Sequence, residues 1–166
     1  MEHQNLKPAL LLDVDGVISL FGFTQDRRPA GAFHWIDGIL HYISAGAGAH
    51  LLRLGERYEL VWATGWELTA NEYLPHLLGL PGELPCLSFD DCPVFGQAHW
   101  KLAAIERFAG QERPLAWIDD CHDGSCHAWA EARPGPTLLV RTRSAEGIRD
   151  EHVDRLLRWA SELSAG

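Results

Sequence analysis

Five short and nearly continuous apolar runs constrain the fold of this chain more than any other feature. They cover residues 9–14, 59–63, 84–89, 115–118 and 137–140. Runs of this kind are typical of strands that are buried on both faces. Between and after them lie stretches with helical periodicity, at 45–56 after a Ser44 cap, 67–78, 98–109, 123–132 and from Val153 to Leu163. This alternation predicts an α/β fold, a three-layer α/β/α sandwich around a five-stranded parallel Rossmann-like sheet.

The length of the chain limits how many domains it can form. Its 166 residues match one ordinary domain, so we expect a single domain over residues 1–166. The sequence has no apolar stretch long enough to span a membrane and no recognisable signal peptide, which predicts a cytoplasmic protein with no membrane partner. The net charge of −9 argues against a generally basic nucleic-acid footprint, although it leaves room for a local patch.

Polar residues follow three of the five apolar runs directly. Ligands bind at the carboxyl ends of strands in open parallel sheets, so we expect these residues to converge at one rim. The first run leads into Asp13-Val14-Asp15-Gly16, the second into Thr64-Gly65 and the fourth into Asp119-Asp120, while Lys101 opens the helix before the fourth. The predicted rim therefore holds four carboxylates, one hydroxyl and one lysine.

Lys101 stands out because the chain uses arginine almost everywhere else. Of the 14 basic residues only Lys7 and Lys101 are lysines. An ammonium is a compact point charge and a guanidinium a broad planar fork, so a site built around a single oxygen can require lysine. This choice favours a specific role for Lys101.

Carboxylates crowded in a partly dry cleft repel one another unless a cation neutralises them. Magnesium prefers oxygen ligands and is usually held by one or two carboxylates together with a substrate phosphate. With Asp13 and a carboxylate from Asp119-Asp120 as ligands, the ion would lie beside an incoming phosphoryl group. Thr64, Gly65 and Lys101 would bind the phosphoryl oxygens. The sequence therefore predicts a Mg²⁺-dependent phosphoryl-transfer site.

The ordered set of Asp13-Val14-Asp15-Gly16-Val17, Thr64, Lys101 and Ile118-Asp119-Asp120 resembles the four motifs of the haloacid dehalogenase (HAD) superfamily. The resemblance implies that Asp13 is the nucleophile that forms an aspartyl-phosphate. It implies that Asp15 is the general acid–base and that its backbone carbonyl helps to hold Mg²⁺. Aspartate at the second position favours a phosphatase over a dehalogenase. The fourth motif fits either the Asp119-Asp120 pair or Asp119 with Asp123, and we favour the adjacent pair.

Members of this superfamily differ in the caps inserted between their motifs. The interval from Asp15 to Thr64 must hold a flap hairpin and a helix, and that from Thr64 to Lys101 a helix and a strand. Neither leaves room for a folded cap, so the resemblance implies a capless enzyme. An open site admits bulky substrates such as nucleic-acid ends, nucleotides or phosphoproteins, unless an oligomeric partner serves as the lid. The sequence also resembles small HAD proteins related to RNA-repair domains, which makes RNA ends one candidate substrate.

Several alternatives stay open at this point. A receiver-like module or a catalytically silent phosphate-binding module would use the same fold, but a receiver carries its acidic pair at the first strand and its catalytic Thr and Lys late. Zinc binding by the cysteines is an alternative that their spacing does not favour. Trp35 and Trp66 are candidates to stack on a base or an aromatic leaving group, whereas His34 and His99 receive no catalytic role. The four cysteines are Cys86, Cys92, Cys121 and Cys126.

Overall fold

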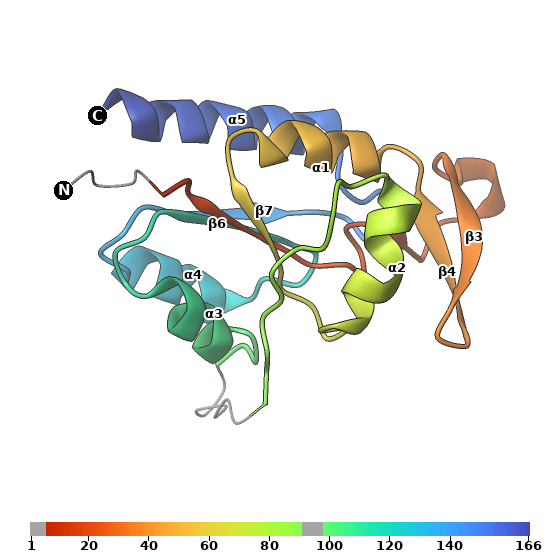
Figure 1. Cartoon of the computed structure of the whole chain (residues 1–166), viewed down its shortest axis with the longest axis horizontal. Coiled ribbons are helices and arrows are strands. Elements are labelled where there is room, and N and C mark those ends of the chain that lie inside the picture. Colours follow the sequence, from red (N-terminus) through yellow and green to blue (C-terminus); the bar gives the residue numbers. More distant parts are fainter. Residues whose placement is uncertain (1–5, 91–97) are drawn as a thin grey trace.

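A computed structural model describes residues 6–90 and 98–166 of the chain (Figure 1). Its elements follow one another in this order: β1 (Ala9–Leu12), β2 (Ser19–Leu20), the 3-10 helix η1 (Gln25–Arg27), β3 (Gly31–Ile36), β4 (Ile39–Ser44), α1 (Ala47–Gly55), β5 (Glu59–Trp62), α2 (Thr69–Leu78), α3 (Leu102–Ala109), β6 (Leu115–Asp119), α4 (Gly124–Ala132), β7 (Thr137–Arg141) and α5 (Asp150–Ala165). None of the described helices is long and apolar enough to cross a membrane.

The parallel sheet has the strand order β5-β1-β6-β7. Its central strand β1 is fully buried, and alternate side chains point into two different apolar clusters. Leu10 and Leu12 pack with residues of α1 and α5, whereas Ala9 and Leu11 pack with residues of α3. Figure 1 shows the same arrangement, with α1 and α5 above the sheet and α3 and α4 below it. This confirms the predicted α/β layers and explains why the strands read as continuous apolar runs.

The predicted fifth strand at 84–89 is wrong, and the parallel sheet has four strands. Only an isolated parallel bridge forms, between Trp62 and Cys86. The Asn71 side chain from α2 replaces strand pairing at Leu84, because it accepts a hydrogen bond from the Leu84 N–H (3.0 Å) and donates one to the Leu84 carbonyl (2.7 Å). Pro85 has no N–H to give to a ladder, so pairing stops after one bridge.

The helices lie where the periodicity predicts them, although their first residues differ. The helix predicted at 45–56 spans Ala47–Gly55, and its N-cap is Gly46 rather than Ser44, which lies in β4. The helix predicted at 98–109 begins at Leu102, with Lys101 as its N-cap. In both cases turn or loop residues precede the helix, 45–46 after β4 and 98–101 before α3.

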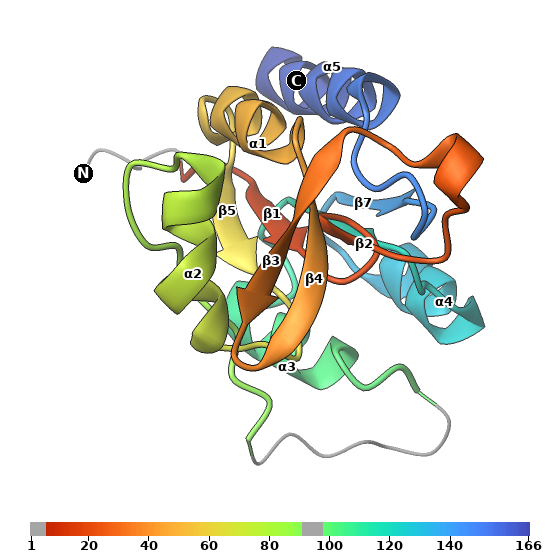
Figure 2. The same cartoon turned by 90° about the vertical axis from the view of Figure 1, so that its right-hand side faces the viewer.

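A small antiparallel sheet with the order β2-β4-β3 lies between β1 and α1 in the sequence. Asp37 and Gly38, both with positive φ (49° and 77°), form the two-residue turn between β3 and β4, as expected for a tight hairpin. Figure 2 shows this hairpin in front of the parallel sheet, on the side where its carboxyl ends lie. The interval between Asp15 and Thr64 thus contains the flap hairpin and helix that were predicted there.

Candidate active site

Three neighbouring parallel strands end at the same rim and bring three polar residues together. The Asp13 N–H donates to the Ile118 carbonyl of β6 (3.1 Å), and the Ala63 N–H donates to the Leu12 carbonyl of β1 (2.7 Å). These bonds place Asp13 beside Asp119 on one side and beside Thr64 on the other. All three residues are buried, with relative exposures of 7%, 1% and 1%.

Lys101 completes the centre of the site from the start of α3. Its Nζ lies 3.0 Å from Asp13 Oδ1 and 2.6 Å from Asp119 Oδ2, and the residue is only 3% exposed. The Asp119 carboxylate also accepts hydrogen bonds from the Trp117 indole N–H (3.2 Å) and from the Cys121 N–H (2.9 Å). A single lysine therefore bridges two buried carboxylates at the rim.

The carboxylates of this cluster have different proton affinities. Burial raises the pKa of Asp13 to about 7, with a smaller contribution from the charge of Asp119 and against the opposing charge of Lys101. Burial alone would also raise the pKa of Asp119, but the charge and hydrogen bond of Lys101 outweigh burial and hold it below its usual value. Burial and the charge of Asp119 together raise the pKa of Asp120. One lysine thus faces the two buried carboxylates of Asp13 and Asp119, and the half-buried Asp120 follows directly in the sequence.

Asp120 is held close to the loop that follows β1. Gly16 has a positive φ of 79°, and a Cβ added there would come within 2.2 Å of Asp120 Oδ2. The Gly16 carbonyl accepts a hydrogen bond from Thr142 Oγ1 (2.8 Å), which fixes the loop against β7. The glycine of the first motif is therefore required both for its backbone conformation and for the space that the Asp120 carboxylate occupies.

Substituting Gly16→Ala is expected to lower activity by about 10²-fold, because the new methyl group must displace Asp120. It should also cost about 1–3 kcal/mol of stability from the unfavourable φ. Gly79→Ala is the matched control, since Gly79 has a φ of 66° but nothing within 4 Å of an added Cβ. Parallel measurements of kcat and of thermal unfolding check this; similar activity losses in both variants would show that the position of Asp120 is unimportant.

Thr64 and Gly65 form the turn at the end of β5. The Thr64 Oγ1 accepts a hydrogen bond from the Trp66 N–H (3.2 Å), and the Thr64 carbonyl accepts one from the Glu67 N–H (3.1 Å). Gly65 lies under the ring of Trp100, which is 3.7 Å from where a Cβ would be. Hydrogen bonds of Thr64 thus fix one side of the turn, and the Trp100 ring covers Gly65 on the other.

Asp15 lies apart from the buried centre. Its side chain is 52% exposed, and its Oδ2 accepts a hydrogen bond from the Trp66 indole N–H (3.0 Å). The ring of His41, on β4, packs against Trp66 at 4.5 Å, and its Nδ1 lies 3.9 Å from Asp15 Oδ1. The two aspartates of the first motif therefore have distinct environments, one buried against Lys101 and one at the surface beside aromatic rings.

Sequence reasoning missed three residues of this site. Trp117 donates to Asp119, His41 lies beside Asp15, and Trp100 places its ring 5.2 Å from Lys101 Nζ. The only signal for Trp100 is its position directly before Lys101. Trp117 reads as one more apolar residue of β6, and His41 lies on a hairpin whose packing against the rim is not readable from its own sequence.

Asp123, the alternative metal ligand of the fourth motif, caps a helix. It is the N-cap of α4, where its Oδ1 accepts hydrogen bonds from the N–H groups of Ser125 (2.9 Å) and Cys126 (3.2 Å) and from Ser125 Oγ (2.5 Å). These bonds hold its pKa at about 2, first through the Ser125 hydroxyl. A carboxylate with this many donors is a helix cap, which favours the adjacent pair Asp119-Asp120 for the metal.

The cysteines of the described ranges do not gather into a zinc site. Cys86, Cys121 and Cys126 are free thiols, and Cys92 lies outside the described residues. In the two described stretches, one group of metal-ligating atoms lies within 4.8 Å of one another, and it consists of Asp119, Asp120 and Cys121. Two of its three members are carboxylates of the predicted magnesium site.

The residues at the rim fit a hard divalent cation. Asp13, Asp119 and Asp120 bring three carboxylates to a site with one lysine, which lies within 3.0 Å of two of them. Oxygen ligands of this kind are those that Mg²⁺ prefers. Asp13 and the Asp119-Asp120 pair would hold the ion, and Asp119 already accepts three hydrogen bonds from Lys101, Trp117 and Cys121.

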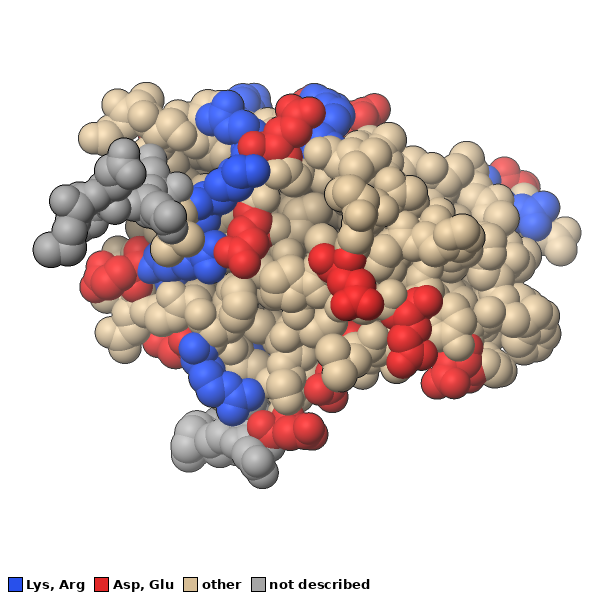
Figure 3. Space-filling view, viewed as in Figure 1, with Lys and Arg blue, Asp and Glu red and all other residues tan. Residues whose placement is uncertain are grey.

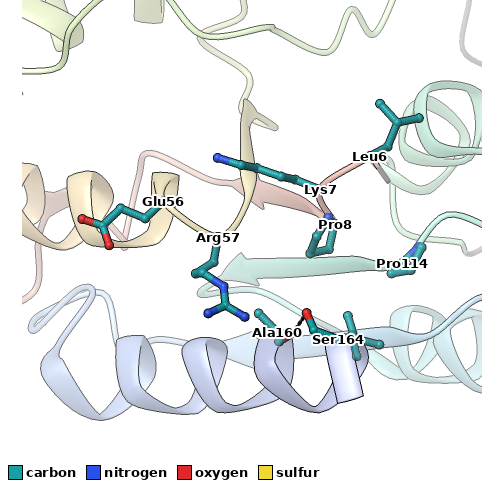
Figure 4. Close-up of a pocket in the computed structure, with 9 residues that line it drawn as sticks. Leu6, Lys7, Pro8, Glu56, Arg57, Pro114, Ala160 and Ser164 are labelled. Atoms are coloured by element: carbon teal, nitrogen blue, oxygen red, sulfur yellow. Dashed lines mark hydrogen bonds between the residues drawn. The ribbon is translucent and has the colours of Figure 1, made fainter. Parts of the chain in front are cut away.

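A hollow lies at the end of the parallel sheet that is opposite the candidate active site. It has a volume of about 280 Å³ and is lined by residues that include Lys7, Pro8, Glu56, Arg57 and Pro114 (Figure 4). Pro8 and Pro114 directly precede β1 and β6, so this hollow faces the amino ends of the strands. Ligands of open α/β sheets bind at the carboxyl ends, where Asp13 and Asp119 lie, so we assign no function to it.

Comparison with known proteins gives one family match. The family model described as "HAD domain in Swiss Army Knife RNA repair proteins" matches residues 9–153. Among solved structures, the crystal structure of hypothetical protein XCC2798 from Xanthomonas campestris aligns over 96% of this chain and 86% of that chain, at 17% identity and a TM-score of 0.48. No curated protein matches the sequence.

Proposed function

The chain belongs to the family of HAD domains found in Swiss Army Knife RNA repair proteins, and from this premise we propose that it is a Mg²⁺-dependent phosphohydrolase. Its substrate is a phosphate monoester at an RNA end, and its reaction passes through an aspartyl-phosphate on Asp13. The family match favours a phosphohydrolase over the receiver-like alternative.

One observation carries this proposal. Lys101 Nζ lies within 3.0 Å of both Asp13 and Asp119 in a buried centre at the carboxyl end of the sheet. A cation in this position holds the Asp13 carboxylate in place and offsets the charge of an incoming phosphoryl group. A catalytically silent phosphate-binding module would gain little from a buried carboxylate at the position of Asp13, because the carboxylate would repel the phosphate.

The residues divide the reaction into two steps. Asp13 attacks the phosphorus atom while Asp15 gives its proton to the leaving oxygen, so that an alcohol leaves and Asp13 carries the phosphoryl group. Asp15 then takes a proton from water, which attacks the phosphorus and regenerates the Asp13 carboxylate with release of phosphate. Thr64, Gly65 and Lys101 bind the phosphoryl oxygens throughout.

Mg²⁺, held by Asp13, the Asp119-Asp120 pair and the Asp15 carbonyl, would supply positive charge at the phosphoryl oxygens. In its absence Lys101 is the counter-charge that the described residues offer to this centre. We therefore expect hydrolysis of an activated aryl phosphate to stop when a chelator removes the metal and to return when Mg²⁺ is added in excess.

An RNA end is favoured because the site is open and because of the family context. On the face drawn in Figure 3, acidic side chains gather along the lower right, towards α2 and the hairpin, whereas Lys and Arg lie mainly at the upper left. A long polyanion would not be attracted along that acidic region. This distribution is consistent with a substrate that is held mainly by its terminal nucleotide.

A substrate panel tests the proposed function. It compares 3′- and 5′-phosphorylated oligoribonucleotides, sugar phosphates and phosphopeptides, each with Mg²⁺ and with chelator. We expect the phosphorylated oligoribonucleotides to be hydrolysed with the highest kcat/KM. If no substrate of the panel released phosphate in a Mg²⁺-dependent way, the proposal would be contradicted. A preference for phosphopeptides would contradict its RNA substrate.

Asp15→Asn is expected to slow turnover by about 10² to 10⁴-fold, the usual contribution of a general acid–base. The effect should be largest for an alkyl leaving group, which needs the proton, and smaller for an activated aryl phosphate. Affinity for inorganic phosphate should change little, because Asp15 lies outside the buried centre. Steady-state kinetics with both substrates check this, and equal rates for wild type and variant on the alkyl ester would remove Asp15 from this role.

A further inference from the structure

A hollow of about 270 Å³ opens directly beside the predicted phosphate site. The residues that line it come from the loop after β1, the hairpin and the start of α2: Asp15, Ile36, Asp37, Ile39, His41, Gly65, Trp66 and Thr69. Two of them, Asp15 and Gly65, also belong to the predicted phosphate site. A group bonded to the phosphate on the Asp15 side would therefore extend into this hollow.

The general acid of the proposed reaction forms one edge of this pocket. The Trp66 indole N–H donates to Asp15 Oδ2 (3.0 Å), and the His41 ring packs on Trp66 at 4.5 Å. His41 is itself fixed, because its Nδ1 lies 2.9 Å from Ser19 Oγ. Asp15 must face the leaving oxygen to protonate it, so the pocket that it borders is where the leaving group lies.

The lining defines the chemistry of that leaving group. Ile36, Ile39 and the rings of Trp66 and His41 give apolar and aromatic walls, which suit a flat ring. Asp37 adds a carboxylate that accepts hydrogen bonds from hydroxyl or N–H groups. Among the described lining residues none is Lys or Arg, so the pocket offers no partner for a second phosphate, and the internucleotide phosphate of an RNA end would lie outside it.

We propose that this pocket takes the nucleoside that carries the scissile phosphate, with its ring against Trp66 and Ile39 and its hydroxyl or N–H groups towards Asp37. The proposal rests on the proposed function, and it names which part of the RNA end is recognised. A tyrosine side chain offers a ring but no neighbouring donors for Asp37, so the lining favours a nucleoside over a phosphotyrosine.

The test compares substrates that share a phosphate monoester but differ in the leaving group. Wild type should hydrolyse uridine 3′- or 5′-monophosphate with a kcat/KM at least about tenfold above that of glycerol phosphate, the size of effect that apolar pocket contacts give. In Ile39→Ser this ratio should fall about five- to tenfold. Leu40→Ser is the matched control: Leu40 is the next residue of β4, is 47% exposed and points to the opposite face.

Binding of the product nucleoside tests the pocket without turnover. Titration calorimetry with uridine should show binding to wild type and to Leu40→Ser, and about five- to tenfold weaker binding to Ile39→Ser. Trp66→Phe keeps a ring in the wall but lacks the N–H. Its uridine affinity should therefore stay close to that of wild type, while its hydrolysis of glycerol phosphate should slow by about tenfold because Asp15 is no longer held.

The outcomes separate this proposal from the proposed function. Mg²⁺-dependent hydrolysis with no preference for nucleotides, or with a ratio that Ile39→Ser leaves unchanged, would overturn the pocket assignment and leave the phosphatase intact. Faster hydrolysis of phosphotyrosine than of the nucleotides would contradict a nucleoside in this pocket and indicate a peptide as its occupant. If no monoester is hydrolysed, the proposed function fails, and unaltered uridine binding by Ile39→Ser would then also overturn the pocket.

Discussion

Asp13→Asn is expected to lower kcat by at least about 10⁴-fold, because an amide neither attacks phosphorus nor serves as an anionic metal ligand. The variant should fold normally. Burial raises the pKa of Asp13 to about 7, so an uncharged side chain of the same shape avoids part of the cost of burying a charge there. Without Mg²⁺ its thermal unfolding temperature should equal or exceed that of wild type.

Kinetics and thermal unfolding, both with and without Mg²⁺, check this expectation. The stabilising effect of Mg²⁺ should be smaller in Asp13→Asn than in wild type, since one anionic ligand is gone. Activity within tenfold of wild type would exclude Asp13 as the nucleophile. An inactive variant that is also unfolded would say nothing of the mechanism, which is why unfolding is measured on the same samples.

Lys101→Met should affect both stability and catalysis. It leaves the Asp13 and Asp119 carboxylates buried without a counter-charge, which in comparable buried pairs costs about 3–5 kcal/mol. It also removes a cation from the phosphoryl site, so activity should fall by about 10² to 10³-fold. Lys101→Arg keeps the charge but spreads it over a larger planar group, and should fold while still losing much of the activity.

A double variant separates the two effects of Lys101. Lys101→Met combined with Asp119→Asn removes both partners of the 2.6 Å contact and should recover part of the lost stability but none of the activity. Urea unfolding in chelator and kinetics in Mg²⁺ provide the two readouts. Wild-type turnover in Lys101→Arg and Lys101→Met would make Lys101 an ordinary structural lysine and remove it from the site.

The polar residues at the strand ends could be predicted because the local sequence is enough to identify them. Asp13, Thr64 and Asp119 each follow an apolar run, and the rule that parallel strands share one functional rim brings them together whatever the details of packing. Lys101 was predictable for another reason, since lysine is so rare in this chain. The structure brings Asp13, Asp119 and Lys101 into contact and buries Thr64 at the end of the neighbouring strand, while their catalytic roles stay predictions.

Features that depend on tertiary contacts were not predictable in the same way. The segment at 84–89 has the composition of a strand, but a side chain of α2, Asn71, takes the hydrogen bonds of Leu84. The contact between Trp66 and Asp15 joins residues 51 positions apart, and nothing in either local pattern signals it. The pocket beside Asp15 depends on where the β3–β4 hairpin packs, which only the complete fold determines.

The phosphorylation state of Asp13 during turnover tests the central claim most directly. In Asp15→Asn an activated aryl phosphate needs no general acid, so the first step should proceed while hydrolysis of the intermediate is slow. Acid quenching followed by peptide mass spectrometry should then find one phosphoryl group on the peptide that contains Asp13. This group should be released by hydroxylamine and absent in chelator or in Asp13→Asn. Continued turnover with Asp13 unmodified, or a phosphoryl group on any other residue, would contradict the account.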